Sequence, residues 1–160
     1  MKLSVDEAYR LYADRVFAAA FSICRSQADA DDVTQETFIK YHTSSPDFLD
    51  SDHIRAWLLR VAINRAKDLR SSFRRKHEVA WEDYMDELPF EAPEDSRLFE
   101  AVMRLPDKYR AVIHLFYYED YSVHEIAGLL HSREGTVKSQ LNRGRALLKT
   151  ILQEEWNDDE

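Results

Sequence analysis

The sequence is poor in the residues that interrupt or cross-link a chain. Its 160 residues include three glycines, four prolines and one cysteine. So few turn-forming residues disfavour a β-rich fold, and recurring amphipathic stretches favour an all-α fold. The single cysteine, Cys24, excludes a disulfide within the chain. Long apolar runs and a signal-type N-terminus are also missing, so we expect a soluble, cytoplasmic protein with no direct membrane insertion.

Motifs for enzyme chemistry are missing as well. The sequence has no phosphate loop and no nucleophile motif. HEIAG at His124 begins like a zinc-protease helix, but Gly128 stands where the second ligand histidine is required. The acids at residues 29–36 are better explained as a protein-facing patch than as a metal site, and Cys24 is expected to be buried. We therefore expect no catalysis, no cofactor, no metal and no small-molecule substrate.

The excess of acids over bases equals the charge of one segment. Residues 77–96 hold eight acids and no Lys or Arg, which equals the net charge of −8. Residues 54–76 have the opposite character, with eight Lys or Arg residues and one acid, Asp68. A basic block of this kind indicates a polyanionic partner.

The acidic segment also divides the chain. It contains Pro89 and Pro93 and has no helical period, so we expect one helical domain at residues 1–76, a linker at 77–96 and a second helical domain at 97–155. The linker is either a solvated spacer or a segment that docks on a domain or a partner. Docking is favoured by four residues that are costly to expose to water: Trp81, Tyr84, Leu88 and Phe90.

The last third of the chain has the layout of a helix-turn-helix. Ser122 and Glu125 have capping-box spacing, which predicts a helix from about Val123 with Ile126 and Leu130 buried. In the second helix an inner stripe follows steps of three and four residues: Val137, Leu141, Gly144, Leu148 and Ile151. The outer row is polar and cationic: Lys138, Asn142, Arg145 and Lys149, with Ser139 and Arg143 beside it. This row can face phosphates and base edges, although an ordinary charged surface helix fits the pattern equally well.

The N-terminal part shows three helical patterns. The first begins with Ser4 and Glu7 at capping-box spacing. The second covers about residues 28–42 and is expected to bury Val33, Thr37, Phe38 and Tyr41. Opposite this buried stripe lies an acidic and amide patch with one lysine: Asp32, Gln35, Glu36 and Lys40.

The third pattern covers residues 54–76 and follows a polar loop, TSSPDFLDSD. Its inward positions are apolar: Leu58, Ala62, Ala66, Leu69 and Phe73. Its outer face is polar and basic: Arg60, Asn64, Lys67, Ser71 and Arg74. Trp57 lies near the start of this helix, where an aromatic beside a basic face suits stacking on an unpaired base. On helical spacing, however, a core position for Trp57 is favoured.

Four segments carry a resemblance to a known family. DADDVTQETFIKYH, AWLLRVAINRAKDLRSSFRRK, LPDKYRAVIHLFYYEDYSVHEIAGLL and GTVKSQLNRGRALL occur in the right order. They resemble the signature segments of bacterial extracytoplasmic-function (ECF) sigma factors of RNA polymerase. The resemblance implies two small helical domains, a sigma region 2 bundle and a sigma region 4 helix-turn-helix, joined by the acidic linker.

The resemblance also implies a role for each surface. The partners would be core RNA polymerase, through its β′ clamp helices and β flap, promoter DNA, and an anti-sigma factor. The residues implied in docking on the clamp helices are Asp32, Gln35 and Glu36. Those implied in contacting the minus-ten element are Asn64, for an extruded base, and Arg60, Lys67, Arg70, Arg74 and Arg75, for the backbone. Those implied in contacting the minus-thirty-five duplex are Lys138, Ser139, Asn142, Arg143 and Arg145.

The chain departs from the family pattern at the turn of the helix-turn-helix. Family members usually place Gly, an aliphatic residue and Ser where this chain has His131, Ser132 and Arg133. Because glycine enters a left-handed turn without steric cost, His131 is expected to strain or alter the turn. Ser132 removes an apolar plug, or caps the second helix instead. A stand-alone helix-turn-helix regulator that binds duplex DNA without polymerase is the alternative function.

Overall fold

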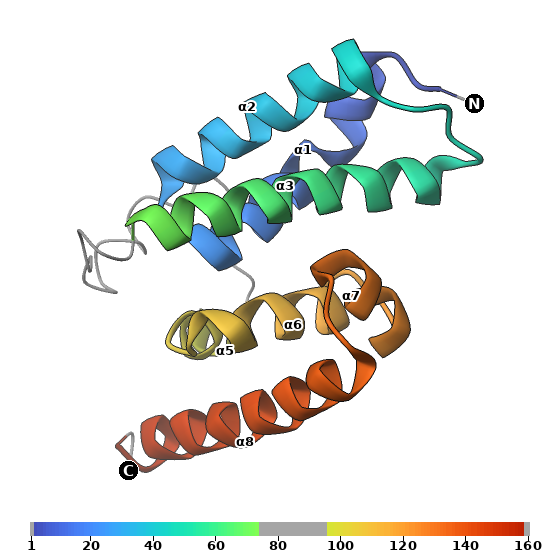
Figure 1. Ribbon diagram of the computed structural model, residues 1–160. Coiled ribbons are helices and arrows are strands. Elements are labelled where there is room, and N and C mark those ends of the chain that lie inside the picture. Colours follow the sequence, from blue (N-terminus) through green and yellow to red (C-terminus); the bar gives the residue numbers. More distant parts are fainter. Residues whose placement is uncertain (1, 74–95, 159–160) are drawn as a thin grey trace. The chain divides into compact units, whose positions relative to one another are not determined.

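The computed structural model describes residues 2–73 and 96–158, and in these ranges it contains seven helices and no strand (Figure 1). The predicted all-α fold is confirmed. The chain forms two compact units, Met1–Val79 and Ala80–Glu160. The docking predicted for the linker falls on residues outside the described ranges.

The first unit is a bundle of three helices, α1 (Val5–Cys24), α2 (Gln27–Ser44) and α3 (Ser51–Phe73), each packed against the other two (Figure 1). The Ser4 hydroxyl accepts a hydrogen bond from the backbone N–H of Glu7, which is one of the two bonds of the predicted capping box. Arg25 adopts a left-handed conformation, with φ of 52°, and ends α1. Ser26 then caps α2, so α1 and α2 are joined by a two-residue turn.

The part of the core that α2 contributes follows its predicted stripe. Val33, Thr37, Phe38 and Tyr41 of α2 are all buried. The buried hydroxyl of Thr37 donates to the Val33 carbonyl at 2.7 Å, and Tyr41 donates to the Leu3 carbonyl at 2.6 Å. Because both hydroxyl groups are hydrogen-bonded, their burial does not carry the free-energy penalty of an unsatisfied polar group.

The prediction for the start of α3 was wrong by three residues. The helix begins at Ser51 because the Asp50 carboxylate accepts a hydrogen bond from the backbone N–H of His53 at 2.9 Å, as a helix cap does. Trp57 therefore lies in the second turn. It is partly buried, and its ring meets Tyr41 and Phe48 edge-on, with ring centroids 6.1 and 5.9 Å away. Packing in an aromatic cluster is the reading that the structure supports for this side chain.

The second unit contains α5 (Ser96–Met103), α6 (Asp107–Tyr117), α7 (Val123–Leu130) and α8 (Glu134–Asp158). Helices α7 and α8 are the predicted helix-turn-helix, and α8 packs against α5, α6 and α7. The capping box of Ser122 and Glu125 is present in full. The predicted inner residues of both helices are buried, apart from Leu148 and Ile151, which are partly exposed.

A buried arginine anchors the start of α6. Arg110 is fully buried, and its guanidinium donates to the Leu105 carbonyl and to the Asp107 carboxylate, both at 2.7 Å. A charge in a protein core requires such partners. These bonds fix the turn between α5 and α6. They thereby fix the position of the first turn of α6.

Candidate nucleic-acid interface

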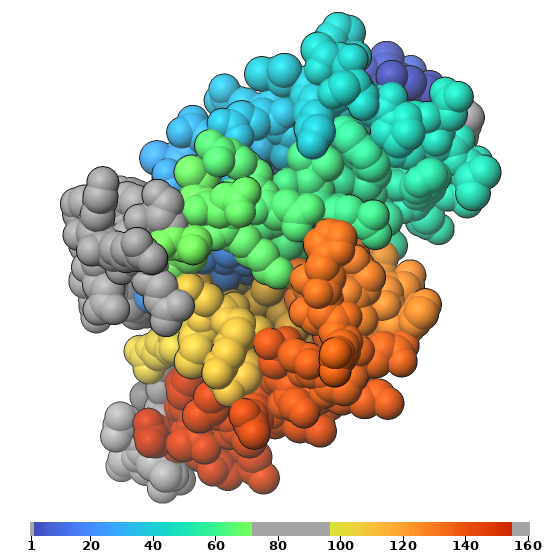
Figure 2. Space-filling model, in the orientation of Figure 1, coloured from blue at the N-terminus to red at the C-terminus, as the bar shows by residue number. Residues whose placement is uncertain are grey.

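The acidic face of α2 is exposed as predicted. Asp32, Gln35 and Glu36 are all exposed on one side of the helix, and Ile39, 63% exposed, continues the same stripe one turn later. Glu36 accepts a hydrogen bond from Nε of Arg65 on α3 at 2.8 Å, and this bond raises the pKa of Arg65. The surfaces of α2 and α3 adjoin on the face seen in Figure 2. An acidic surface and a basic surface therefore meet along one edge of the first unit.

The basic face of α3 carries the residues predicted to contact the minus-ten element. Arg60 and Lys67 are exposed, while Asn64 and Arg70 are partly buried. The Lys67 residue as a whole is exposed, yet partial burial of its ammonium group lowers its pKa. Two of the predicted residues, Arg74 and Arg75, lie outside the described ranges.

The loop before α3 is anchored on one side and open on the other. Phe48 is buried and stacks on Tyr41, with ring centroids 5.8 Å apart. The next residue, Leu49, is 87% exposed, and its backbone N–H donates to Nδ1 of His53 at 3.1 Å. This loop therefore places a solvent-exposed apolar side chain, Leu49, just before the basic helix α3.

The turn between α7 and α8 keeps a left-handed residue despite its atypical sequence. His131 has φ of 54° and ψ of 41°, the conformation that glycine adopts without cost. His131 thus occupies a left-handed conformation, which costs a residue with a Cβ on the order of 1 kcal/mol. Ser132 does not cap α8, because the helix begins at Glu134 and its first backbone bond runs from Val137 to the Arg133 carbonyl. The Ser132 hydroxyl instead lies 3.5 Å from the Leu130 carbonyl, in a partly buried position.

The exposed side of α8 is divided between two edges. Lys138, Ser139, Asn142 and Arg143 are exposed, as predicted. Arg145 is exposed but engaged. Its Nε donates to the Tyr117 hydroxyl at 2.6 Å, and its guanidinium lies over the rings of Phe116 and Tyr117 at 5.1 and 5.6 Å. One edge of α8 is thereby tied to the end of α6.

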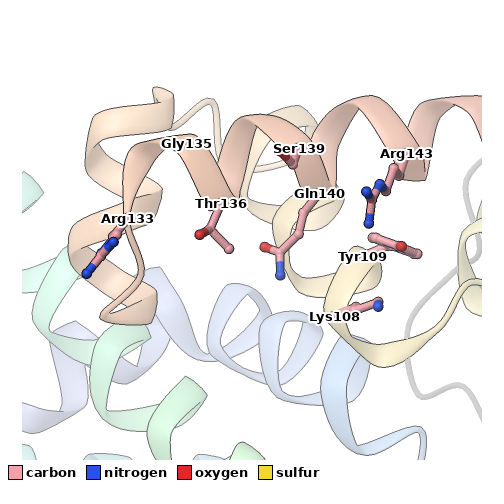
Figure 3. Close-up of a pocket in the computed structure, with 8 residues that line it drawn as sticks. All are labelled: Lys108, Tyr109, Arg133, Gly135, Thr136, Ser139, Gln140 and Arg143. Atoms are coloured by element: carbon pink, nitrogen blue, oxygen red, sulfur yellow. The ribbon is translucent and has the colours of Figure 1, made fainter.

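The other edge of α8 lines a groove of about 560 Å³. Figure 3 shows Lys108 and Tyr109 of α6 beneath α8, with Gln140 and Arg143 pointing toward them and Arg133 at the start of the helix. The remaining lining residues are Gly135, Thr136 and Ser139. Sequence reasoning missed Lys108 and Arg133, because neither lies on the periodic face of a predicted helix and only the crossing of α6 and α8 brings them together.

Sites of other kinds are not found in the described residues. Within residues 2–73 and 96–158, no group of three or more His, Cys, Asp or Glu side chains is placed to hold a metal ion. None of the described helices is both long enough and apolar enough to span a membrane. Cys24 is buried, and its thiol lies 3.8 Å from the Ala66 carbonyl.

The fold and its surfaces define a class of DNA-binding transcription protein, with a basic helix-turn-helix in one unit and an acidic and a basic face in the other. Comparison with known families makes the class specific. Residues 8–77 match Sigma-70 region 2, and residues 96–148 match Sigma-70, region 4. The second match covers α5, α6, α7 and most of α8.

Curated relatives agree. The ECF RNA polymerase sigma factor SigL of Mycobacterium tuberculosis is 32% identical, over 91% of this chain and 87% of the relative. SigE of Mycolicibacterium smegmatis, also an ECF sigma factor, is 34% identical over 93% of this chain, which spans 62% of that relative's length. SigW of Bacillus subtilis is 27% identical over 90% of this chain and 86% of the relative.

Two solved structures share the fold. One is the sigma factor RpoE in complex with the anti-sigma factor NepR from Bartonella quintana, with a TM-score of 0.69, 20% identity and coverage of 92% of this chain and 96% of that chain. The other is CnrH in complex with the cytosolic domain of CnrY, with a TM-score of 0.64, 26% identity and coverage of 93% and 87%. The chain belongs to the ECF RNA polymerase sigma factor family. Its function is that of an alternative sigma factor that directs promoter-specific transcription.

Proposed function

We propose that the chain joins core RNA polymerase through the acidic face of α2. Asp32, Gln35 and Glu36 project together from a helix whose opposite side is buried, so they form a rigid surface. Carboxylates and an amide in this arrangement suit an arginine-rich helical partner, as the β′ clamp helices are in the family. The observation that carries the proposal is this exposed acidic face on a unit that matches region 2.

The adjoining basic face of α3 then engages the minus-ten element. Arg60, Lys67, Arg70, Arg74 and Arg75 bind backbone phosphates, and Asn64 contacts a base of the non-template strand extruded from the stack. An amide offers both a donor and an acceptor to the edge of such a base. Partial burial restricts the rotamers of Asn64, which favours a defined contact.

The second unit reads the minus-thirty-five element as duplex DNA. The contact residues are Lys138, Ser139, Asn142, Arg143 and Arg145 on α8, and the unit also rests on the β flap of the polymerase. Because Arg145 already donates to Tyr117, its role includes holding α8 against α6 while its charge faces the DNA. The protein acts in the cytoplasm, where the polymerase is, and has no catalytic role of its own.

An anti-sigma factor is the proposed regulator. The complex of CnrH with the cytosolic domain of CnrY supports this, since a chain of the same fold binds another protein there. Such a partner would prevent polymerase binding by covering the polymerase-binding surfaces, among them the acidic face of α2 described above.

The test is transcription in vitro with purified core polymerase. Addition of the protein to core is expected to start transcription at a distinct set of promoters, and the protein is expected to co-elute with core. A stand-alone regulator would instead bind duplex DNA without core. Failure both to co-elute with core and to direct initiation overturns the proposal.

A further inference from the structure

The groove beside α8 has the chemistry of an anion site. Its lining includes three cations, Lys108, Arg133 and Arg143, and no acid. Hydroxyl groups of Thr136 and Ser139 and the amide of Gln140 complete its polar surface. None of the three cations forms an ion pair with a residue in the described ranges. Positive charge without internal compensation is available for an external anion.

The backbone adds donors at one end of this groove. The first backbone bond within α8 comes from the N–H of Val137, so the N–H groups of Gly135 and Thr136 have no acceptor within the helix. Both residues line the groove. A Cβ added at Gly135 would meet nothing within 4 Å, so space is open there. Helix N-termini with free N–H groups favour phosphate, and here the groove reaches that end, where Arg133 lies (Figure 3).

The groove is also continuous with the surface that faces DNA. Ser139 and Arg143 belong both to the groove and to the predicted minus-thirty-five set. Residues four apart share an edge of a helix, so Ser139 and Arg143 form one row and Thr136 and Gln140 form the next. The side chains of this second row lie on the side of α8 that faces Lys108 of α6 (Figure 3).

We propose that Lys108 and Arg133 bind backbone phosphates of the duplex that α8 reads, so that the DNA contact extends onto α6. This inference rests on the proposed function. Arg143 lies between the groove and the base-facing row. Arg133 stands where family members usually have serine, so the atypical turn, strained at His131, supplies a cation that the usual turn lacks. Lys108 and Arg133 hold the duplex at two points on either side of the groove.

The experiment uses holoenzyme, assembled from core polymerase and the full chain, on a promoter recovered with the wild-type protein. Binding is measured against salt concentration for the double variant Lys108→Gln with Arg133→Gln. Each lost phosphate contact lowers the slope of log affinity against log salt by about 0.9, so the double variant is expected to lose about 2. Arg104→Gln removes a charge from the same unit outside the groove and is expected to keep the wild-type slope.

Sequence preference and the source of the phosphate are tested in two further arms. The double variant is expected to weaken binding equally on promoters with altered minus-thirty-five bases, whereas Asn142→Ala is expected to change their order. Inorganic triphosphate is titrated into the full chain without DNA. Thermal stabilisation of the wild type, but not of the double variant, at micromolar triphosphate, together with a wild-type salt slope for the double variant, would assign the groove to a free anion and overturn the DNA contact.

The two proposals fail in different ways. If the wild-type holoenzyme does not initiate, the proposed function is wrong. If it initiates and the double variant keeps the wild-type salt slope, only the phosphate contact of Lys108 and Arg133 is wrong.

Discussion

Arg65 on α3 donates from Nε to Oε2 of Glu36 on α2 at 2.8 Å, which joins the basic face of the first unit to its acidic face. Both side chains are about half exposed, at 45% and 50%, so the pair contributes little to stability. Its consequence is for binding. A cationic partner that approaches Glu36 meets a carboxylate that already has a guanidinium beside it, whereas Asp32 forms no ion pair with any residue in the ranges 2–73 and 96–158.

Charge reversal on α2 is expected to weaken polymerase binding. Asp32→Lys and Glu36→Lys each place a cation against a basic partner, and close charge pairs at interfaces contribute on the order of 1.5 kcal/mol or more, so we expect at least a tenfold loss of affinity. Asp14→Lys, the same change at an exposed position of α1, is the control. Affinity for core is measured by fluorescence titration. Normal binding by the α2 variants, together with loss on mutation of Lys40, would show that the docking face was misassigned.

Asn64→Ala is expected to impair promoter opening more than formation of the closed complex. The closed complex holds duplex DNA through phosphate contacts, whereas Asn64 is proposed to contact a base only after it leaves the stack. Arg60→Ala provides the comparison, because loss of a phosphate contact weakens both stages. Permanganate reactivity of unpaired thymines reports opening, and gel shift at low temperature reports the closed complex. An equal loss in both stages for Asn64→Ala contradicts the base-capture role.

Helical periodicity and capping motifs predicted much of this fold, because both depend on residues that are only a few positions apart in the sequence. The burial of Val33 and Phe38 follows from their spacing, and the start of α7 follows from its capping box. The partners of exposed side chains are not local. Tyr117, the partner of Arg145, is 28 residues away in sequence, and Lys108 comes near α8 only because two helices cross. A helical pattern tells which side of α8 is exposed, but not which edge meets α6.

Two substitutions in the turn of the helix-turn-helix are expected to increase the stability of the protein. His131→Gly should raise the free energy of unfolding by about 1 kcal/mol, because glycine adopts a φ of 54° without the steric cost that a Cβ brings. Ser132→Ile should raise the melting temperature by restoring an apolar side chain at a partly buried position. Thermal unfolding of the full chain measures both. An unchanged melting temperature for Ser132→Ile would mean that the site does not bury the added side chain.

Acid is expected to destabilise the second unit through His114. His114 is 8% exposed, and its ring stacks on Tyr118 with centroids 5.2 Å apart; burial lowers its pKa to about 4 from an ordinary 6.5. Between these values the unfolded chain binds a proton that the folded chain does not. The free energy of unfolding is therefore unaffected by this group above pH 6.5. It falls by up to about 3 kcal/mol as the pH decreases toward 4.

The measurement for His114 is urea unfolding of the full chain at several pH values. Because carboxylates impose a pH dependence of their own, the informative quantity is the difference between wild type and His114→Leu. The variant is expected to lose less stability than the wild type between pH 6.5 and 4. Parallel curves for the two proteins would contradict the assignment of this loss to His114.

Two glycines are expected to respond to alanine with opposite signs. A Cβ at Gly144 of α8 would lie 3.3 Å from Cγ1 of Ile113 and 3.4 Å from Cβ of Tyr109, and both neighbours are buried in α6. Because a packed core yields poorly, Gly144→Ala should cost more in overpacking, typically 1 to 3 kcal/mol, than the gain of about 1 kcal/mol in helix propensity. A Cβ at Gly128 of α7 would meet nothing within 4 Å, so Gly128→Ala should keep the whole gain. The free energy of unfolding of both variants is measured by chemical unfolding of the full chain. A rise for Gly144→Ala would show that α6 and α8 can move apart at this position without a loss of stability.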